Sequence, residues 1–144
     1  MTTTEGRTEE RRPTRMEPPV TPTTEPFWDA TRRGELVLQW CRNCQVPVFY
    51  PREVCPGCLG DGLEWRPATG KGRIYTFTVE HRPNPVLGDR YVVALVDLEE
   101  GARVMSNVVN CPPDKVEVGM AVRVTWEELS DGRRLPLFEP DQEA

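Results

Sequence analysis

The second half of the chain alternates apolar and polar residues in the way that β-strands do. Residues 74–81 read I-Y-T-F-T-V-E-H, which predicts a strand with Tyr75, Phe77 and Val79 on one face. Residues 91–98 are almost continuously apolar, which predicts a strand buried on much of both faces. Turn residues and one short connector with a single helical turn, at 112–118, separate three further predicted strands: 103–109, 121–129 and 134–138.

Five strands over residues 70–139 predict a small barrel. The helical link between the third and fourth strands favours a five-stranded Greek-key barrel of the OB type. An SH3-like barrel is the competing topology, because periodicity does not determine which strands pair. Residues 140–144 are expected to form a short tail.

The N-terminal quarter has two parts with different composition. Residues 1–24 hold eight Thr and four Pro and almost nothing apolar, so we expect a disordered tail. Residues 25–38 then predict a short helix at about 25–33 and a lead-in strand at 35–40. Thr24 suits the N-cap, Pro26 the first turn and Gly34 the helix end. The helix would carry Phe27, Trp28 and Thr31 near one side.

Two identical cysteine pairs mark residues 39–66. Cys41 and Cys44 form one C-x-x-C pair, and Cys55 and Cys58 form the other, with ten residues between the pairs. Each pair can aim both sulfurs at one ion, and four thiolates in a tetrahedron suit Zn²⁺. A closed four-sulfur site leaves no position for a substrate, so the zinc would be structural.

Two other uses of these cysteines stay open at this point. Two disulfides are one alternative, although the Thr-, Glu- and Arg-rich start of the chain does not resemble a secretory signal. We therefore expect a cytoplasmic protein with reduced thiols. A rubredoxin-like iron site, and hence an electron carrier, is the other alternative.

The remaining composition limits the function further. No apolar run is long enough for a membrane helix, and the net charge of −5 opposes nonspecific nucleic-acid binding. Cys111 lies outside the two pairs and is expected to be a buried or half-buried free thiol at a strand end. His81, the only histidine, has no nearby Ser or Cys in the sequence, so no catalytic residues are predicted.

Helix, cysteine ribbon and barrel, in this order, resemble a known family: the acyl-CoA-associated OB-fold proteins with an N-terminal rubredoxin-like zinc ribbon, long catalogued as a domain of unknown function. The resemblance covers about 25–139. One departure is Gln45, where the family pattern leads us to expect glycine. The matching segments are E-P-F-W at 25–28, G-E-L at 34–36, Q-W-C-R-N-C at 39–44, F-Y-P-R-E-V-C-P-G-C at 49–58, G-K-G-R-I-Y-T-F-T at 70–78 and V-G-M-A-V at 118–122.

The resemblance implies a non-catalytic accessory subunit. Such proteins are similar to partners of thiolase-fold enzymes, including thiolases, enzymes like HMG-CoA synthase, and lipid-transfer-protein-type aldolases that cleave steroid side chains from CoA thioesters. The partner would carry the chemistry, and an acyl-CoA would lie at the shared interface. We expect Phe27 and Trp28 to dock on this partner, or else to cap the chain's own barrel.

Two further expectations concern arginines. Arg73, Arg82 and Arg90 are candidates for contacts with the CoA phosphates, because guanidinium groups bind phosphate oxygens in pairs. A nucleic-acid-binding protein is the alternative function, since zinc ribbons and OB folds both occur in that class. Acidic residues are interspersed among the barrel arginines, which disfavours this alternative.

Overall fold

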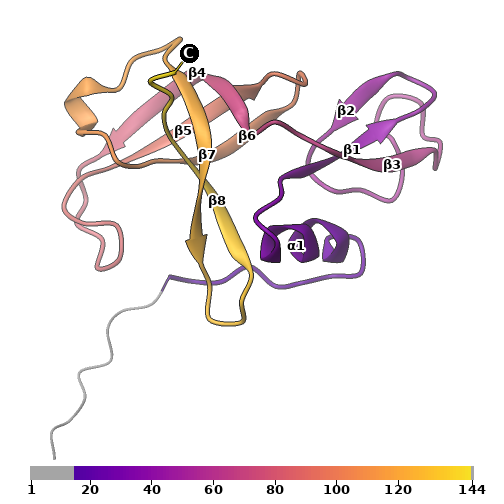
Figure 1. Cartoon of the computed structure of the whole chain (residues 1–144), viewed down its shortest axis with the longest axis horizontal. Coiled ribbons are helices and arrows are strands. Elements are labelled where there is room, and N and C mark those ends of the chain that lie inside the picture. Colours follow the sequence, from indigo (N-terminus) through magenta and orange to yellow (C-terminus); the bar gives the residue numbers. More distant parts are fainter. Residues whose placement is uncertain (1–14, 144) are drawn as a thin grey trace, which may run out of the picture.

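A computed structural model describes residues 15–143, and β-strands form most of their regular structure (Figure 1). One helix, α1 (Glu25–Arg32), comes first, and one 3₁₀ turn, η1 (Pro113–Lys115), follows the sixth strand. The strands are β1 (Val37–Cys41), β2 (Val46–Val48), β3 (Leu63–Pro67), β4 (Lys71–Glu80), β5 (Tyr91–Leu98), β6 (Arg103–Val108), β7 (Ala121–Glu128) and β8 (Arg134–Pro140).

The last five strands close into a barrel with the order β4-β5-β6-β8-β7, and β4 pairs with β7 to complete the ring. Strands β6 and β8 run parallel and meet at Val108 and Phe138, whereas the other neighbours are antiparallel. This crossover is a Greek-key connection, which an antiparallel meander lacks. The predicted five-stranded OB-fold barrel is confirmed, and the SH3-like alternative is wrong.

A bulge in β4 changes one predicted strand face. The register with β5 shifts between Ile74 and Thr76, so the residues before and after Tyr75 follow different alternations. Ile74 is 1% exposed and lies in the core, while Tyr75 is 49% exposed. The prediction that Tyr75 shares a face with Phe77 and Val79 is therefore wrong, because periodicity does not reveal an inserted residue.

Strand β5 alternates more regularly than its apolar sequence predicts. Val92, Ala94, Val96 and Leu98 are buried, and the residues between them are half-buried. One face therefore belongs to the barrel core, and only part of the other face is covered.

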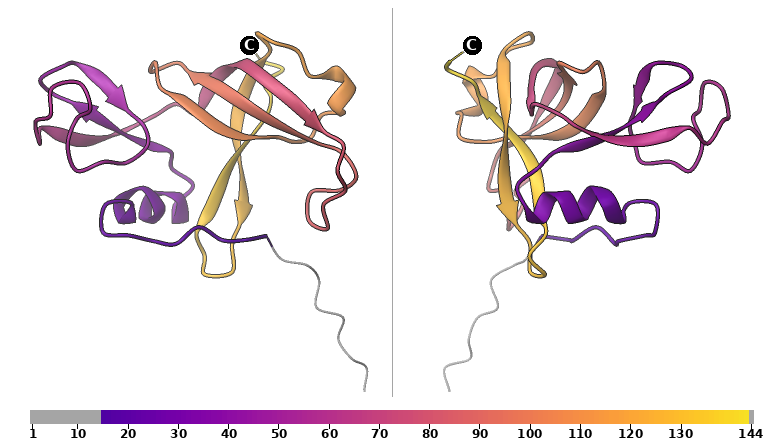
Figure 2. Two further views of the ribbon diagram at one scale, coloured as in Figure 1. Left: turned by 180° about the vertical axis from the view of Figure 1, so that it is seen from behind. Right: turned by 45° about the vertical axis from the view of Figure 1, so that its right-hand side comes forward.

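The cysteine-containing segment forms a separate three-stranded ribbon in which β1 lies between β2 and β3. Both pairings are antiparallel, and β3 continues after a short link into β4 of the barrel. Figure 2 shows the ribbon beside the barrel, with α1 running beneath the junction of the two. The sequence indicated no strand at β3, because only Leu63 and Trp65 are apolar there.

Helix α1 closes this junction with its apolar side. Phe27, Trp28 and Thr31 are all buried, as their spacing predicts. The Thr31 hydroxyl donates to the Trp28 carbonyl at 2.6 Å and accepts the Arg134 N–H of β8 at 3.2 Å, which ties the helix to the barrel. Gly34 follows the helix at a φ of 69°, the left-handed conformation expected of a helix end. Within residues 15–143, no helix is long and apolar enough to cross a membrane.

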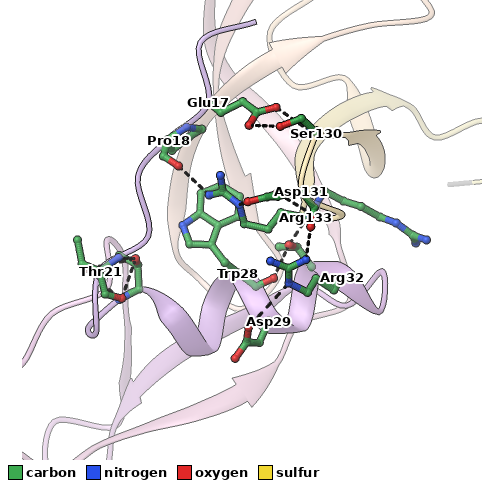
Figure 3. Close-up of polar contacts among 12 residues, drawn as sticks. Glu17, Pro18, Thr21, Trp28, Asp29, Arg32, Ser130, Asp131 and Arg133 are labelled. Carbon is green, nitrogen blue, oxygen red and sulfur yellow. Dashed lines mark hydrogen bonds and ion pairs between the residues drawn. The ribbon is translucent and has the colours of Figure 1, made fainter.

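Residues 15–19, here called the strap, run along the β7–β8 hairpin (Figure 3). The Glu17 carboxylate accepts the backbone N–H and the hydroxyl of Ser130, both at 2.7 Å. Arg133 donates to the Pro18 carbonyl at 2.7 Å, pairs with Asp131 at 2.7 Å, and stacks on the Trp28 ring. The Arg133 side chain is only 5% exposed, so these contacts satisfy a buried guanidinium.

The predicted disorder of residues 1–24 therefore does not hold for 15–24, and residues 1–14 lie outside the described residues. Composition predicted disorder because this segment carries little apolar surface of its own. The strap is held instead by charged and backbone groups that pair with the hairpin, and a count of apolar residues does not register such partners. Thr24 also makes no side-chain cap to the helix; its hydroxyl bonds with Thr21.

The strap contacts yield a test by truncation. A chain that starts at Glu25 is expected to be less stable than one that starts at Arg15 by about 1–3 kcal/mol, because Arg133 loses its hydrogen bond to the Pro18 carbonyl and Ser130 loses its two hydrogen bonds to the Glu17 carboxylate. Chemical denaturation of both chains measures the difference. Equal free energies of unfolding would show that the strap contributes nothing to the fold.

Candidate metal centre and the surfaces around it

The ribbon gathers its four paired cysteines at one end. Cys41 ends β1, Cys44 lies in the turn to β2, and Cys55 and Cys58 lie in the loop between β2 and β3. All four Sγ atoms lie within 4.8 Å of one another, and none of the four is in a disulfide.

The sulfur spacing fits a tetrahedral zinc ion. The Sγ atoms of Cys41 and Cys58 are 3.7 Å apart, and those of Cys44 and Cys55 are 3.9 Å apart. Four sulfurs at the usual Zn–S length of about 2.3 Å would be about 3.8 Å from one another. Disulfide bonds need about 2 Å, so this geometry excludes the disulfide alternative.

Both knuckles have the same backbone form. The N–H of the residue after each pair donates to the carbonyl of the first cysteine at 2.8 Å, from Gln45 to Cys41 and from Leu59 to Cys55. Gln45 and Leu59 adopt left-handed φ values of 59° and 60°. Gln45 thus takes the conformation for which glycine was expected, and its side-chain amide donates to the Arg42 carbonyl at 2.9 Å.

Backbone donors around the sulfurs favour thiolates. The N–H groups of Cys58 and Gly57 hold the pKa of Cys55 below its ordinary value, and that of Gly60, with the Asn43 side chain, lowers the pKa of Cys58 to about 6. Hydrogen bonds to Cys58 and Cys55 raise the pKa of Cys44 to about 12. Bound zinc would supply the positive charge that keeps all four sulfurs deprotonated. The four-sulfur set is closed, which is typical of a structural ion.

A buried glutamine that was not predicted from the sequence holds the loop between the knuckles. Gln39 of β1 is 6% exposed, and its amide donates to the Arg52 carbonyl at 2.8 Å and accepts the Arg52 N–H at 2.7 Å. The only signal in the sequence for this role was a polar residue inside a mostly apolar predicted strand, two positions before Cys41.

Phe27 and Trp28 lie in the chain's own core. Each is 7% exposed, and both belong to the cluster that joins α1 to the barrel. The structure therefore uses them to cap the barrel, which was the second of the two expectations. Docking of these residues on a partner stays a prediction. Any such contact would involve only the small part of each side chain that is exposed to solvent.

The three candidate arginines do not form one site. Arg73 lies near the start of β4 and donates to the Gly119 carbonyl at 3.1 Å. Arg82 lies beyond the far end of β4, about 30 Å along the strand at about 3.3 Å per residue. Arg90, at the start of β5, pairs with Asp114 at 3.1 Å. Only Arg82 and Arg90 flank the same loop, between β4 and β5. Contact with CoA phosphates therefore stays a prediction, and Arg73 would make it at a different place from Arg82 and Arg90.

An apolar groove lies where ribbon, helix and barrel meet, and no pattern in the sequence indicated it. Its volume is about 400 Å³. We call it the junction groove. Its walls come from five segments of the chain: Pro18, Pro19, Thr24, Phe27, Trp28, Phe49, Tyr50, Pro51, Met105, Ser106, Asn107, Leu135, Pro136 and Leu137.

The fifth cysteine lies apart from the metal centre. Cys111 is a half-buried free thiol after β6, as expected, and its sulfur donates to the Pro112 carbonyl at 3.5 Å. It thus serves as an internal control for the ligand cysteines.

Replacing Cys58 with Ser is expected to abolish zinc binding and unfold the ribbon, because metal binding supplies most of the folding energy of so small a module. Elemental analysis of reduced protein should find one zinc per chain in the wild type and in Cys111→Ser, and far less in Cys58→Ser. A full zinc equivalent in Cys58→Ser would contradict the assignment, and a red, iron-containing protein would favour the electron carrier.

Leu59→Gly is expected to stabilise the ribbon by about 0.5–1 kcal/mol. Leu59 is 74% exposed, so its removal costs little burial, while glycine relieves the left-handed backbone. The matched control is Val118→Gly, because Val118 is also exposed, at 67%, but has an ordinary φ. The effect is measured as the chelator concentration at which half of the zinc is released. A lower concentration for Leu59→Gly than for the wild type would contradict the strain argument.

Comparison with known proteins assigns both modules. Residues 28–64 match the model of the ChsH2 rubredoxin-like zinc ribbon domain, and residues 65–127 match that of the ChsH2 C-terminal OB-fold domain. Structural zinc, predicted from the cysteine pairs, is thereby confirmed over iron and over disulfides.

Several relatives are described by function. The chain is 37% identical over 134 residues to a probable enoyl-CoA hydratase alpha subunit of Thermomonospora curvata, and 31% identical over 133 residues to the 3-oxo-4,17-pregnadiene-20-carboxyl-CoA hydratase alpha subunit of Mycobacterium tuberculosis. These matches cover 91% and 88% of this chain but only 42% and 40% of the two relatives. The chain thus spans about two fifths of the length of these hydratase subunits.

Two other proteins match over most of their length. A DUF35 domain-containing scaffold protein of Methanothermobacter thermautotrophicus is 39% identical over 120 residues, which cover 78% of this chain and 90% of the relative. A chain of the solved Ltp2-ChsH2(DUF35) aldolase is 35% identical and superposes with a TM-score of 0.77, over 86% of this chain and 98% of that one. The expected resemblance is confirmed: this chain belongs to the DUF35 family, with a ChsH2-type rubredoxin-like zinc ribbon followed by an OB-fold domain.

Proposed function

We propose that this chain is a non-catalytic accessory subunit that binds a thiolase-fold enzyme and helps to position an acyl-CoA thioester. The proposal includes a steroid side chain as the acyl group. Chemistry would belong to the partner, and this chain would contribute a surface.

One observation carries the proposal: the match to a chain of the Ltp2-ChsH2(DUF35) aldolase, which covers 98% of that chain. That aldolase has two named components, Ltp2 and ChsH2, and the DUF35 designation goes with ChsH2. The archaeal relative is described as a scaffold protein, and both bacterial relatives are described as alpha subunits of CoA-thioester hydratases. Each description fits a protein that works in a complex.

The geometry of the metal centre supports the same role. Four cysteines fill a tetrahedron, so zinc held there has no open position at which to polarise a carbonyl or activate water. The zinc would instead fix the fold of the ribbon. The ribbon in turn forms one wall of the junction groove.

The barrel surface does not favour the nucleic-acid alternative. Arg103 pairs with Asp97 at 2.6 Å, Arg90 with Asp114 at 3.1 Å, and Arg123 with Glu139 at 3.3 Å. A neighbouring acid offsets each of these arginines, so the described barrel strands present no purely basic track for a phosphate backbone.

Purification of the tagged chain from its native host tests the proposal. We expect a thiolase-fold protein to co-purify in a fixed ratio, and the isolated chain to show no turnover of an acyl-CoA. Adding the chain back to the separated partner should restore or raise the activity or the thermal stability of that enzyme. Mass spectrometry identifies the partner, and release of free CoA reports turnover.

Two results would contradict the proposal. Turnover of an acyl-CoA by the isolated, zinc-loaded chain would make the chain an enzyme. A chain that purifies from its host without any thiolase-fold protein would remove the partner on which the accessory role depends.

A further inference from the structure

The junction groove differs in charge from the rest of the molecule. Charged residues make up 28% of the chain, and the net charge is −5. None of the fourteen residues that line the groove is charged. A charged group that entered would give up part of its hydration, and none of the lining residues would be an ionic partner for it. The groove therefore selects an uncharged, apolar occupant.

The rim of the groove exposes large apolar side chains. Met105 of β6 is 58% exposed, and Tyr50 at the end of the ribbon loop is 55% exposed. Together with the groove they make an apolar surface that spans the ribbon and the barrel. Exposed apolar surface of this kind, beside a hollow, is typical of protein interfaces.

Hydrogen bonds tie several walls of the groove to neighbouring elements. Arg133 holds Pro18 of the strap, and the Ser106 hydroxyl donates to the Pro136 carbonyl at 2.8 Å, which links β6 to β8. The Asn107 amide donates to the Val92 carbonyl at 2.9 Å. On the ribbon side, Gln39 holds Arg52, the neighbour of Pro51. A preformed groove loses little conformational entropy when it binds.

The segment that precedes the strap is a poor occupant. Residues 1–14, which precede the strap, are M-T-T-T-E-G-R-T-E-E-R-R-P-T, and only Met1 among them is a large apolar residue. Insertion of such a segment would bury charge against an apolar wall. A second copy of the chain would bring the same net negative charge to the contact.

We propose that the junction groove is the docking site for the partner subunit, which inserts one or more bulky apolar side chains between the strap, the ribbon loop and β6. This inference rests on the proposed function, since it assigns a surface to the complex proposed above. The groove would then require ribbon and barrel together, because Phe49, Tyr50 and Pro51 come from one and Met105 to Asn107 from the other.

Two charge substitutions at the rim test the docking site: Met105→Glu and Tyr50→Glu. Both side chains are more than half exposed, so the fold should tolerate the changes. Val118→Glu is the matched control, because Val118 is 67% exposed and lies outside the groove. Zinc content and melting temperature verify the fold of each variant, and the affinity for the purified partner from the native host is measured by titration.

Each rim variant is expected to weaken the affinity at least about tenfold, as for a substitution at the buried centre of an interface, while Val118→Glu binds like the wild type. A photo-crosslinking residue at position 105 should join the chain to the thiolase-fold partner, and one at position 118 should not. Crosslinks from position 105 that reach only a second copy of this chain would overturn the inference.

The inference and the proposed function fail in different ways. Unchanged affinity of both well-folded rim variants for the captured partner would overturn the docking site and leave the accessory role intact. Rim variants that bind the partner normally but lose binding of a long-chain acyl-CoA would assign the groove to the acyl chain instead. Absence of a thiolase-fold partner from the wild-type preparation would overturn both.

Discussion

Four sulfurs around one ion hold the ribbon together, because the ribbon buries too little apolar surface to fold by itself. Its core cluster contains only three buried residues, Cys41, Val48 and Cys55, and two of them are metal ligands. The barrel has a larger core of strand residues, which continues under α1 and includes Leu38 of ribbon strand β1. Metal coordination therefore dominates at the cysteine end of the ribbon, and apolar burial dominates in the barrel and where β1 contacts it.

The junction between the modules depends on both forces. The ribbon supplies Phe49 and Pro51, α1 supplies Phe27 and Trp28, and the barrel supplies β6 and β8. Zinc thus shapes the junction groove indirectly, by fixing the backbone of the loop that forms one wall. A structural ion without a chemical role can in this way control the surface that we propose as the docking site.

Charged residues contribute at the junction by holding a segment in place. The guanidinium of Arg133 is covered by the ring of Trp28 and satisfied by Asp131 and the Pro18 carbonyl. Its charge is therefore paired where water is largely excluded, which is the condition under which a buried ion is tolerated. Ser130 and Glu127, which pairs with Arg15, also hold the strap, and its Pro18 and Pro19 line part of the groove.

Cysteine spacing predicted the metal ligands, alternation predicted each barrel strand, and helical periodicity predicted the buried side of α1. These patterns are local, so they can be recognised without knowing which residues lie nearby in the fold. Local patterns did not predict five features that depend on tertiary contacts: the bulge at Tyr75, the parallel pairing of β6 with β8, the order of residues 15–24, the role of Gln39 and the junction groove. Each of these features depends on contacts between separate segments of the chain. The residues adjacent in sequence to a strand edge, a buried amide or a guanidinium do not reveal which groups will contact it in the fold.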